Sequence, residues 1–255
     1  MKGVQSHEII LQGLEILNKL EHRGAVGSDP LTGDGAGILI QMPHRFFKTQ
    51  CANVGIHLPE AGRYGAGLVF FPRDRDRAER CIKIMEDVVH REGLQLLGWR
   101  EVPVNNMTIG ETARKSEPIM RQVFIGNPSA DAMDFERRLY GVRKLAAREI
   151  REAGLNASDV EFYICSLSAR TFLYKGQLMA PQVAKYFLDI QNPEMESALA
   201  LCHARYSTNT FPSWSRAQPL RLLAHNGEIN TVRGNTDWIR ARESLFASDL
   251  FPDIK

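Results

Sequence analysis

The sequence predicts a single mixed α+β domain in which helices cover antiparallel sheets. Two observations support this prediction: runs of strand length outnumber segments with helical periodicity, and several predicted strands are neighbours joined by short turns. The chain has 255 residues, of which 44% are hydrophobic and 24% are charged, and these are the proportions of an ordinary globular protein. No internal repeat, low-complexity tract or Ser/Gly linker divides it. We therefore interpret residues 1–255 as one domain.

The first half of the chain is predicted to mix helices with short buried strands. Leu14 and Leu17 recur at helical spacing, Ser6 is a suitable N-cap, and Gly13 weakens this first helix without excluding it. Apolar runs that stop at Pro43 and Pro72 predict strands. The expected elements are helices over 6–20, 46–52 and 74–91, and strands over 36–42, 66–71, part of 94–104, and 119–125.

The second half begins with a long amphipathic helix over 132–153 that Gly154 ends. Strands over 162–167 and 170–174 follow, with a turn at Lys175-Gly176 that leads into 177–179, so this region is predicted to be a β-meander. The remaining expected elements are a helix over 181–188, strands over 198–206 and 220–225, and a closing helix over 235–246 with an apolar side.

Composition and spacing argue against several classes of function. The 32 basic and 30 acidic residues give a net charge of +2, which disfavours nucleic acid or an anionic membrane as the main partner. No apolar run reaches the length of a membrane span. The four cysteines have no paired short spacing and no HExxH motif is present, so neither a disulfide framework nor a metal site is expected. A reducing, cytoplasmic setting is the default expectation.

Three polar, glycine-containing segments are candidates for chemistry, because loops of this composition often position functional groups. They are residues 22–25 with 33–37, residues 203–210, and residues 225–231. The 33–37 stretch has a phosphate-binding interpretation, but it lacks the Lys-Ser/Thr ending of a P-loop and precedes a strand. A tight turn with close backbone contacts is the alternative that we favour. Adjacent Cys202 and His203 would point to opposite faces of a strand, so they do not predict a thiol–imidazole pair.

Two polar positions have two interpretations each. Arg205 lies where an apolar strand gives way to a Ser-Thr-Asn-Thr loop, so it suits bidentate binding of a carboxylate, or else a surface ion pair. Asn226-Gly227 is a strong signal for a type I′ hairpin turn. The same pair could instead place an amide and a backbone N–H side by side as donors to an oxyanion.

Longer motifs resemble one family. The matching stretches are SHEIILQGLEILNKLEHRGAVGSDPLTGDGAGILIQMPHRFF, CHARYSTNTFPSWSRAQPLRLLAHNGEINTVRGN and DWIRARE. They resemble the class II glutamine amidotransferase domain at the N-terminus of the glutamate synthase large subunit, and order and spacing between them also fit. The resemblance implies an Ntn-hydrolase fold, which is a four-layer α/β/β/α sandwich with two stacked antiparallel sheets.

The same resemblance implies a chemistry and a set of roles. Glutamine would be hydrolysed by an N-terminal cysteine whose own α-amine acts as the base. Arg205 would bind the α-carboxylate of glutamine, with Thr208 beside it, and Asn226 and Gly227 would form the oxyanion hole. Arg23 would lie close to the nucleophile.

Two departures from the family pattern lead to further expectations. The strand that carries the nucleophilic cysteine, expected shortly before Lys2-Gly3, is missing, and so is the region that normally binds the α-amino group of the substrate. We therefore expect an incomplete domain without glutaminase activity. The alternatives are a non-catalytic glutamine-binding module and a subunit of a split enzyme.

In whole enzymes of this type the ammonia passes to a synthase domain, where 2-oxoglutarate is aminated and reduced. FMN and an iron–sulfur cluster are expected there, with electrons from a small subunit or ferredoxin, and no cofactor is expected in this chain.

Overall fold

A computed structural model describes residues 3–23, 29–127, 131–156, 160–204, 211–221, 223, 231–243 and 245. Within these ranges the strands form a three-stranded sheet in the order β6-β1-β7 and a four-stranded sheet in the order β3-β4-β2-β5. All their pairings are antiparallel. The strands are β1 (Ala36–Gln41), β2 (Tyr64–Phe71), β3 (Gln95–Glu101), β4 (Ile119–Gly126), β5 (Tyr163–Ile164), β6 (Thr171–Gly176) and β7 (Ala200–His203).

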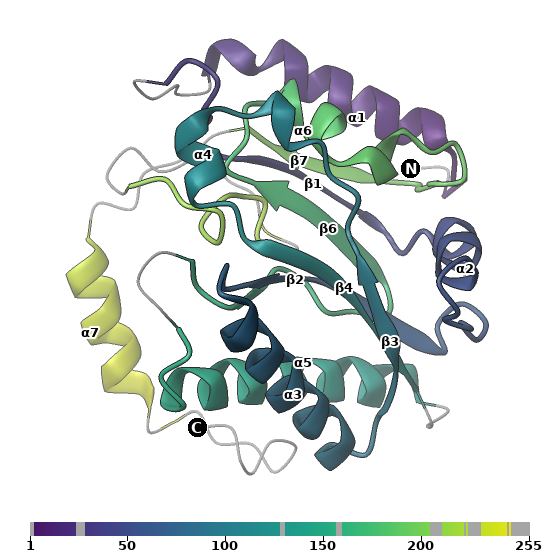
Figure 1. Cartoon of the computed structure of the whole chain (residues 1–255), viewed down its shortest axis with the longest axis vertical. Coiled ribbons are helices and arrows are strands. Elements are labelled where there is room, and N and C mark those ends of the chain that lie inside the picture. Colours follow the sequence, from purple (N-terminus) through teal and green to yellow (C-terminus); the bar gives the residue numbers. More distant parts are fainter. Residues whose placement is uncertain are drawn as a thin grey trace.

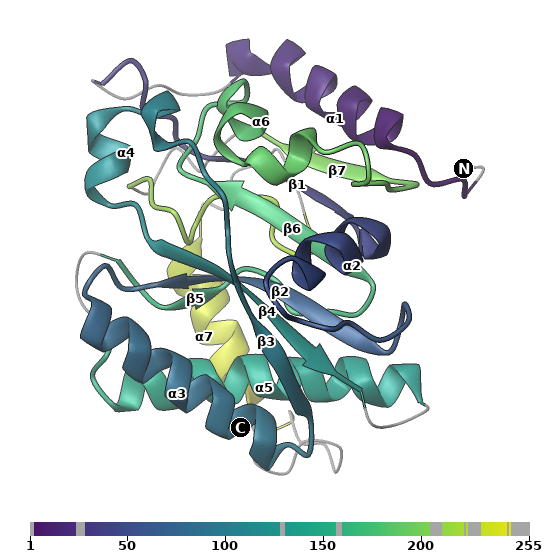
Figure 2. The ribbon, with the colours of Figure 1, turned by 45° about the vertical axis from the view of Figure 1, so that its right-hand side comes forward.

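Helices cover the outer faces of both sheets. In Figure 1 and Figure 2, α1 and α6 lie over the three-stranded sheet, and α3 and α5 lie under the four-stranded sheet. The helices are α1 (His7–Lys19), α2 (His44–Ala52), α3 (Arg75–Arg91), α4 (Glu111–Lys115), α5 (Ala132–Glu152), α6 (Gln182–Tyr186) and α7 (Val232–Glu243). The predicted α/β/β/α sandwich with two stacked antiparallel sheets is therefore confirmed. Across the described ranges, no helix combines the length and apolar character of a membrane span.

The alternation of β2 divides the apolar core into two layers. Leu68 and Phe70 belong to the core between the two sheets, whereas Val69 and Phe71 belong to the core against α3 and α5. Successive side chains of a strand point to opposite faces, so a strand buried on both faces reads as one continuous apolar run. This is why β2 was recognisable from its composition.

Local capping explains several helix boundaries. Asp74 accepts a hydrogen bond from the Arg77 amide at the start of α3, and Asp131 caps α5 in the same way. Gly154 follows α5 with a φ of +67°, a left-handed conformation that favours glycine. Ser6 occupies the N-cap position of α1 as predicted, but its side chain makes no capping bond. Its backbone pairs instead with Ser197.

The predicted β-meander over 162–179 is wrong. β5 pairs with β2 in the four-stranded sheet, whereas β6 pairs with β1 in the other sheet, so the two strands are not hairpin neighbours. Lys175 and Gly176 are not a turn either. They are the last residues of β6, opposite Gly37 and Ala36.

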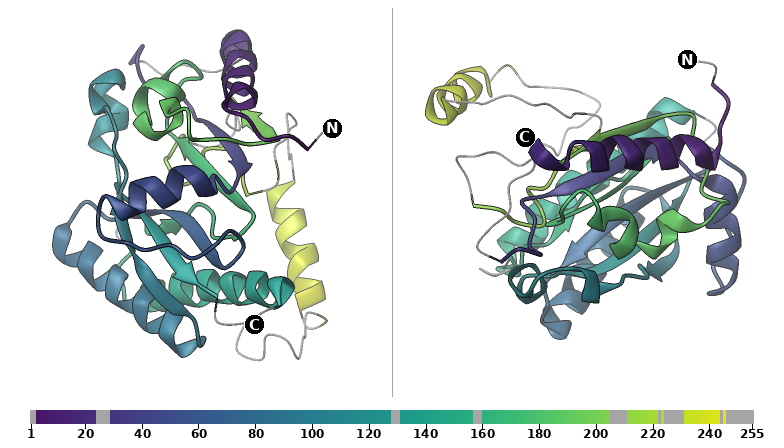
Figure 3. Two further views of the ribbon diagram at one scale, coloured as in Figure 1. Left: turned by 90° about the vertical axis from the view of Figure 1, so that its right-hand side faces the viewer. Right: turned by 90° about the horizontal axis from the view of Figure 1, so that it is seen from above.

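In the C-terminal third, the strands and the last helix have other bounds than predicted. β7 ends at His203, and the described part of 220–225 contains only an isolated bridge between Leu220 and Leu223. The last helix begins earlier than predicted, at Val232. α7 has no buried residue, and it lies at the periphery of the molecule in Figure 3. Its apolar side is therefore exposed, and Trp238 retains 72% of its accessible surface.

Candidate functional site

Two of the three polar segments meet at one end of the three-stranded sheet. Gly37, near the start of β1, pairs with Lys175 of β6 on one side and with His203 of β7 on the other. The 33–37 loop therefore enters the sheet beside the point where the chain leaves β7 toward Arg205. β1 is the central strand, so its pairing with β6 and its pairing with β7 together place the glycine loop next to the end of β7.

Most of the predicted site residues lie outside the described part of the chain. Arg205, Thr208, Asn226 and Gly227 all fall in the undescribed ranges 205–210 and 224–230. Arg23 is the last residue of a 3-10 helix, Glu21–Arg23, and its side chain is also outside the described set. Their assigned roles therefore stay predictions. The structure instead shows the framework from which these segments extend.

Close backbone packing explains the glycines of the 33–37 loop. A Cβ on Gly33 would lie 2.2 Å from the carbonyl carbon of Leu178, and one on Gly37 would lie 2.6 Å from the carbonyl oxygen of Tyr174. Gly35 has a φ of +143°, which L side chains rarely adopt. These contacts support the tight-turn interpretation that we favoured over a phosphate cradle.

Asp29 fastens this loop to α4. Its carboxylate accepts hydrogen bonds from the Leu31 and Thr112 amides and from the Thr32 hydroxyl. These hydrogen bonds lower the pKa of Asp29, and the bond from the Thr112 N–H has the largest effect. Burial has the opposite effect on Asp34, whose pKa is raised. The carboxylate of Asp29 thus satisfies N–H groups in the first turn of α4 and fixes the entry to the glycine loop.

Lys175 is a buried charged residue that the sequence analysis did not identify. Its side chain is fully buried, and its ammonium donates to the carbonyl oxygens of Ser215 and Ala217, each at 2.7 Å. The same nitrogen lies 4.6 Å from the centre of the Tyr163 ring. Burial lowers the pKa of Lys175 to about 8. The available signal was that this lysine directly follows the apolar run Phe-Leu-Tyr, but the sequence analysis assigned Lys175 to a turn.

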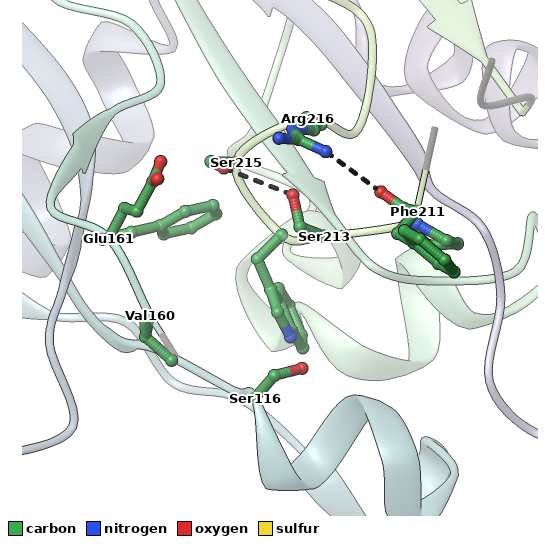
Figure 4. Close-up of a pocket in the computed structure, with 10 residues that line it drawn as sticks. Ser116, Val160, Glu161, Phe211, Ser213, Ser215 and Arg216 are labelled. Carbon is green, nitrogen blue, oxygen red and sulfur yellow. Dashed lines mark hydrogen bonds between the residues drawn. The ribbon is translucent and has the colours of Figure 1, made fainter. Parts of the chain in front are cut away.

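A cavity of about 290 Å³ lies beside the chain that follows the 205–210 segment (Figure 4). The Ser213 and Ser215 hydroxyls lie 3.4 Å apart, and Arg216 donates to the carbonyl oxygen of Phe211 at 3.4 Å. Glu161 and Arg216 are both exposed residues of its lining, so the rim carries both signs of charge. The full lining is Phe70, Ser116, Val160, Glu161 and residues 211–216.

None of the four cysteines has the environment of a nucleophile. Burial raises the pKa of Cys51 and Cys165 to about 12, and that of Cys81 and Cys202 to about 11. Cys202 donates to the carbonyl oxygen of Gly13 in α1, so its thiol faces the helix, as expected for a packing residue. All four are free thiols. A nucleophile requires the thiolate, which these sites disfavour.

We expect the native protein to react slowly with a thiol reagent such as DTNB. At pH 8 the thiols of the folded chain should be modified at least about tenfold more slowly than those of the chain in urea, because raised pKa values and burial both suppress the reactive thiolate. The absorbance of the thiolate that DTNB releases, followed over time, would give both rates. Rapid modification of one thiol in the folded chain would contradict this assignment and identify a reactive cysteine.

Comparison with known proteins places the whole chain in one family. The family model described as "Glutamine amidotransferases class-II" matches residues 1–255. The chain belongs to the class-II glutamine amidotransferases. Its two stacked antiparallel sheets between helices agree with the Ntn-hydrolase fold expected for such a domain.

Several glutamate synthases are similar to this chain. The chain is 50% identical over 253 residues to the glutamate synthase [NADPH] large chain of Bacillus subtilis, a match that covers 98% of the chain and 16% of that protein. It is 43% identical over 258 residues to the glutamate synthase [NADH] of Schizosaccharomyces pombe, covering 98% of the chain and 12% of that protein. For the ferredoxin-dependent glutamate synthase 1 of Arabidopsis thaliana the identity is 40% over 245 residues, with 96% and 15% coverage. The chain therefore spans about one sixth or less of these relatives.

Proposed function

We propose that this amidotransferase domain binds glutamine and serves as the ammonia-producing part of a glutamate synthase. In such an enzyme the side-chain amide of glutamine is hydrolysed, and the ammonia is used to form glutamate from 2-oxoglutarate. The observation that carries the proposal is the family match over every residue of the chain, together with glutamate synthase relatives that cover 95–98% of it.

The proposed roles of the site residues follow the family motifs. The guanidinium of Arg205 binds the α-carboxylate of glutamine, with Thr208 beside it. The amide of Asn226 and the N–H of Gly227 stabilise the oxyanion that forms when the amide carbon is attacked. Arg23 lies near the nucleophile. The register of β1, which brings the start of the 203–210 segment beside the glycine loop, supports one shared site.

The proposed hydrolysis needs a nucleophilic thiolate, and the raised pKa values of the four cysteines of this sequence disfavour a thiolate at each of them. A polypeptide of these 255 residues alone is therefore expected to bind glutamine without hydrolysing it. A non-catalytic glutamine-binding module, or a subunit of a split enzyme, would also bind glutamine without hydrolysing it. For the isolated chain, the absence of an exposed thiol among the four cysteines favours binding without hydrolysis.

Isothermal titration calorimetry with glutamine, combined with an ammonia-release assay, tests the proposal. We expect saturable binding without ammonia release. Arg205→Ala should weaken binding at least about 30-fold, because losing a charged partner of a bound carboxylate costs roughly 2–5 kcal/mol. Arg80→Ala, an exposed position on α3, is the matched control and should bind like the parent.

Two results would count against the proposal. Ammonia release by the parent chain that Arg205→Ala abolishes would show that one of the present residues is the nucleophile. Equal glutamine affinity of the parent chain and Arg205→Ala would refute the assignment of Arg205, and no binding by the parent chain would refute the proposed glutamine binding.

The remaining partners are those of the larger enzyme. We propose synthase domains with FMN and an iron–sulfur cluster outside these residues, and an electron-donating small subunit or ferredoxin. The relatives are named for NADPH, NADH and ferredoxin, so each donor is consistent with the proposal. The four cysteines do not fit a cluster site, because three of them are buried, Cys202 is half-buried, and the described residues hold no group of three or more His, Cys, Asp or Glu that could bind a metal. Four unpaired thiols support a reducing, cytoplasmic setting.

A further inference from the structure

Three cationic side chains from three different parts of the fold converge on Tyr163 of β5. The ammonium of Lys175, in β6, lies 4.6 Å from the centre of the Tyr163 ring. Arg143 of α5 and Arg221 both act electrostatically on Tyr163, and the guanidinium of Arg221 is within reach of its hydroxyl. Arg221 also acts on the charges of Arg143 and Lys175. We call these three residues around Tyr163 the cation cluster.

The positive charges of the cation cluster have no carboxylate partner. Among the described residues, every ion pair involves other side chains than Arg143, Lys175 and Arg221. The Nε atom of Arg221 is buried and has no hydrogen-bond partner within the described chain. Arg114 and Arg121 also have such an Nε, but each of them forms a hydrogen bond through another guanidinium nitrogen. Arg221 is therefore a donor group without an acceptor.

The fold holds these charges together at a cost. Burial, and then the nearby charge of Arg221, lower the pKa of Arg143. Burial also lowers the pKa of Lys175 to about 8, and the charge of Arg221 acts in the same direction. Like charges at close range and charges removed from water are both unfavourable unless a counter-charge is present. An anion bound at the cluster would supply that counter-charge.

The backbone holds Arg221 in an unusual conformation. Its φ is +52°, and it is the only non-glycine residue of the described chain with a positive φ. Two reciprocal hydrogen bonds between the backbones of Leu220 and Leu223, of 2.8 and 2.7 Å, close the turn that contains it. A residue keeps such a conformation only where the surrounding structure imposes it, and such residues concentrate at ligand sites. The position of Arg221 at the cation cluster is therefore fixed by the turn.

We propose that the cation cluster is a binding site for a small divalent oxyanion of the sulfate or phosphate type. Arg143, Tyr163 and Arg221 are half-buried and supply the contacts, whereas Lys175 is fully buried. The planar guanidinium groups match the oxygens of such an ion, and the Tyr163 hydroxyl is a further donor. The Lys175 ammonium already donates to two backbone carbonyl groups, so it contributes its charge rather than a direct bond. This site goes beyond the proposed function, which assigns none of these four residues.

Calorimetric titration of the full chain with sodium sulfate at pH 7 tests the proposal. Sodium chloride keeps the ionic strength constant, because salt screens charged groups. We expect saturable binding of one sulfate per chain, and Arg221→Met should weaken it at least about tenfold through the loss of charge-assisted hydrogen bonds. Tyr163→Phe, which removes only the hydroxyl, should weaken it by less. Arg80→Met, at an exposed position on α3, is the matched control and should bind like the parent.

Thermal denaturation separates a ligand site from a structural role of Arg221. Without sulfate, Arg221→Met should melt no lower than the parent, because it removes a like charge from the cluster. With sulfate, the Tm of the parent should rise more than that of Arg221→Met. Sulfate also stabilises folded proteins in general, so all variants are compared at the same sulfate concentration. If Arg221→Met does not fold, Arg143→Met is expected to show the same loss of binding.

Proton uptake gives a second signature of this site. At pH 8 the ammonium of Lys175 is about half protonated, and a bound anion should raise its pKa toward the ordinary value. Sulfate binding should then take up as much as about half a proton per chain. Calorimetry in two buffers of different ionisation enthalpy measures this uptake, and Lys175→Met should remove most of it.

Two results would overturn the proposal. One is the absence of saturable sulfate binding by the parent chain. The other is equal sulfate affinity of the parent and of the folded Arg221→Met or Arg143→Met variant. None of these measurements uses glutamine, so a failure of the proposed function leaves the test of the cation cluster unchanged.

Discussion

Replacing Asp189 by Ala is expected to reduce the free energy of unfolding by about 3–5 kcal/mol, because it leaves a buried charge without a partner. Arg100 of β3 binds the Asp189 carboxylate through two bonds of 2.8 Å, and both side chains are less than 10% exposed. Gln122 of β4 and Tyr174 of β6 donate to the same carboxylate at 3.1 and 2.9 Å. The cluster therefore links the two stacked sheets through one acceptor.

Urea denaturation of the purified chain measures this effect. Glu15→Ala is a suitable control, because its ion pair with Lys19 lies on the exposed face of α1, where solvent screens the two charges and the pair adds little to stability. The double variant Arg100→Met/Asp189→Leu should recover much of the loss, since it removes both buried charges. A loss below about 1 kcal/mol in Asp189→Ala, or a double variant that is no better than the single one, would contradict this account.

Gly33→Ala is expected to destabilise the domain by about 1–3 kcal/mol or more, the range for overpacking a well-filled interior. The added Cβ would lie 2.2 Å from the carbonyl carbon of Leu178 and 2.3 Å from the amide nitrogen of Met179. Both neighbours are backbone atoms, so no change of rotamer relieves the overlap. The chain after β6 must move instead, and this strains the nearby bonds from the Gln182 side chain to the Leu31 and Thr108 carbonyls.

A glycine without close neighbours is the matched control. Gly234 lies in α7, and among the described residues a Cβ there would meet only Thr231, at 3.7 Å. Gly234→Ala should be neutral or stabilising by up to about 1 kcal/mol, because alanine favours a helix more than glycine does. Thermal denaturation of both variants measures the contrast. If Gly33→Ala melts at the parent temperature, the close packing of this loop against 178–179 is not rigid.

Local patterns in the sequence were sufficient to predict most individual elements. Helices α1, α3 and α5 and strands β1, β2 and β4 lie within a few residues of their predicted bounds. Periodicity, capping residues and terminating prolines act over a few residues, so they can be recognised without knowledge of the fold. The long motifs also predicted the family and its layered fold, and both are confirmed.

The sequence identified the candidate site residues and the polar segments that carry them. The structure describes the strands next to these segments, but not the segments 205–210 and 224–230 themselves. The register of β1 shows that the glycine loop and the end of β7 share one end of a sheet. Arg205 and Asn226 lie outside the described residues, so their roles rest on the motifs alone.

The sequence by itself therefore determined the elements, the family and the chemical character of the polar segments. Only the tertiary structure decided that β5 and β6 belong to different sheets, that the buried Lys175 ammonium donates to the carbonyl oxygens of Ser215 and Ala217, and that α7 exposes its apolar side. The physical reason is distance along the chain. Ser215 meets Lys175 and Asp189 meets Arg100 across separations of 40 and 89 residues, and no local pattern encodes such contacts.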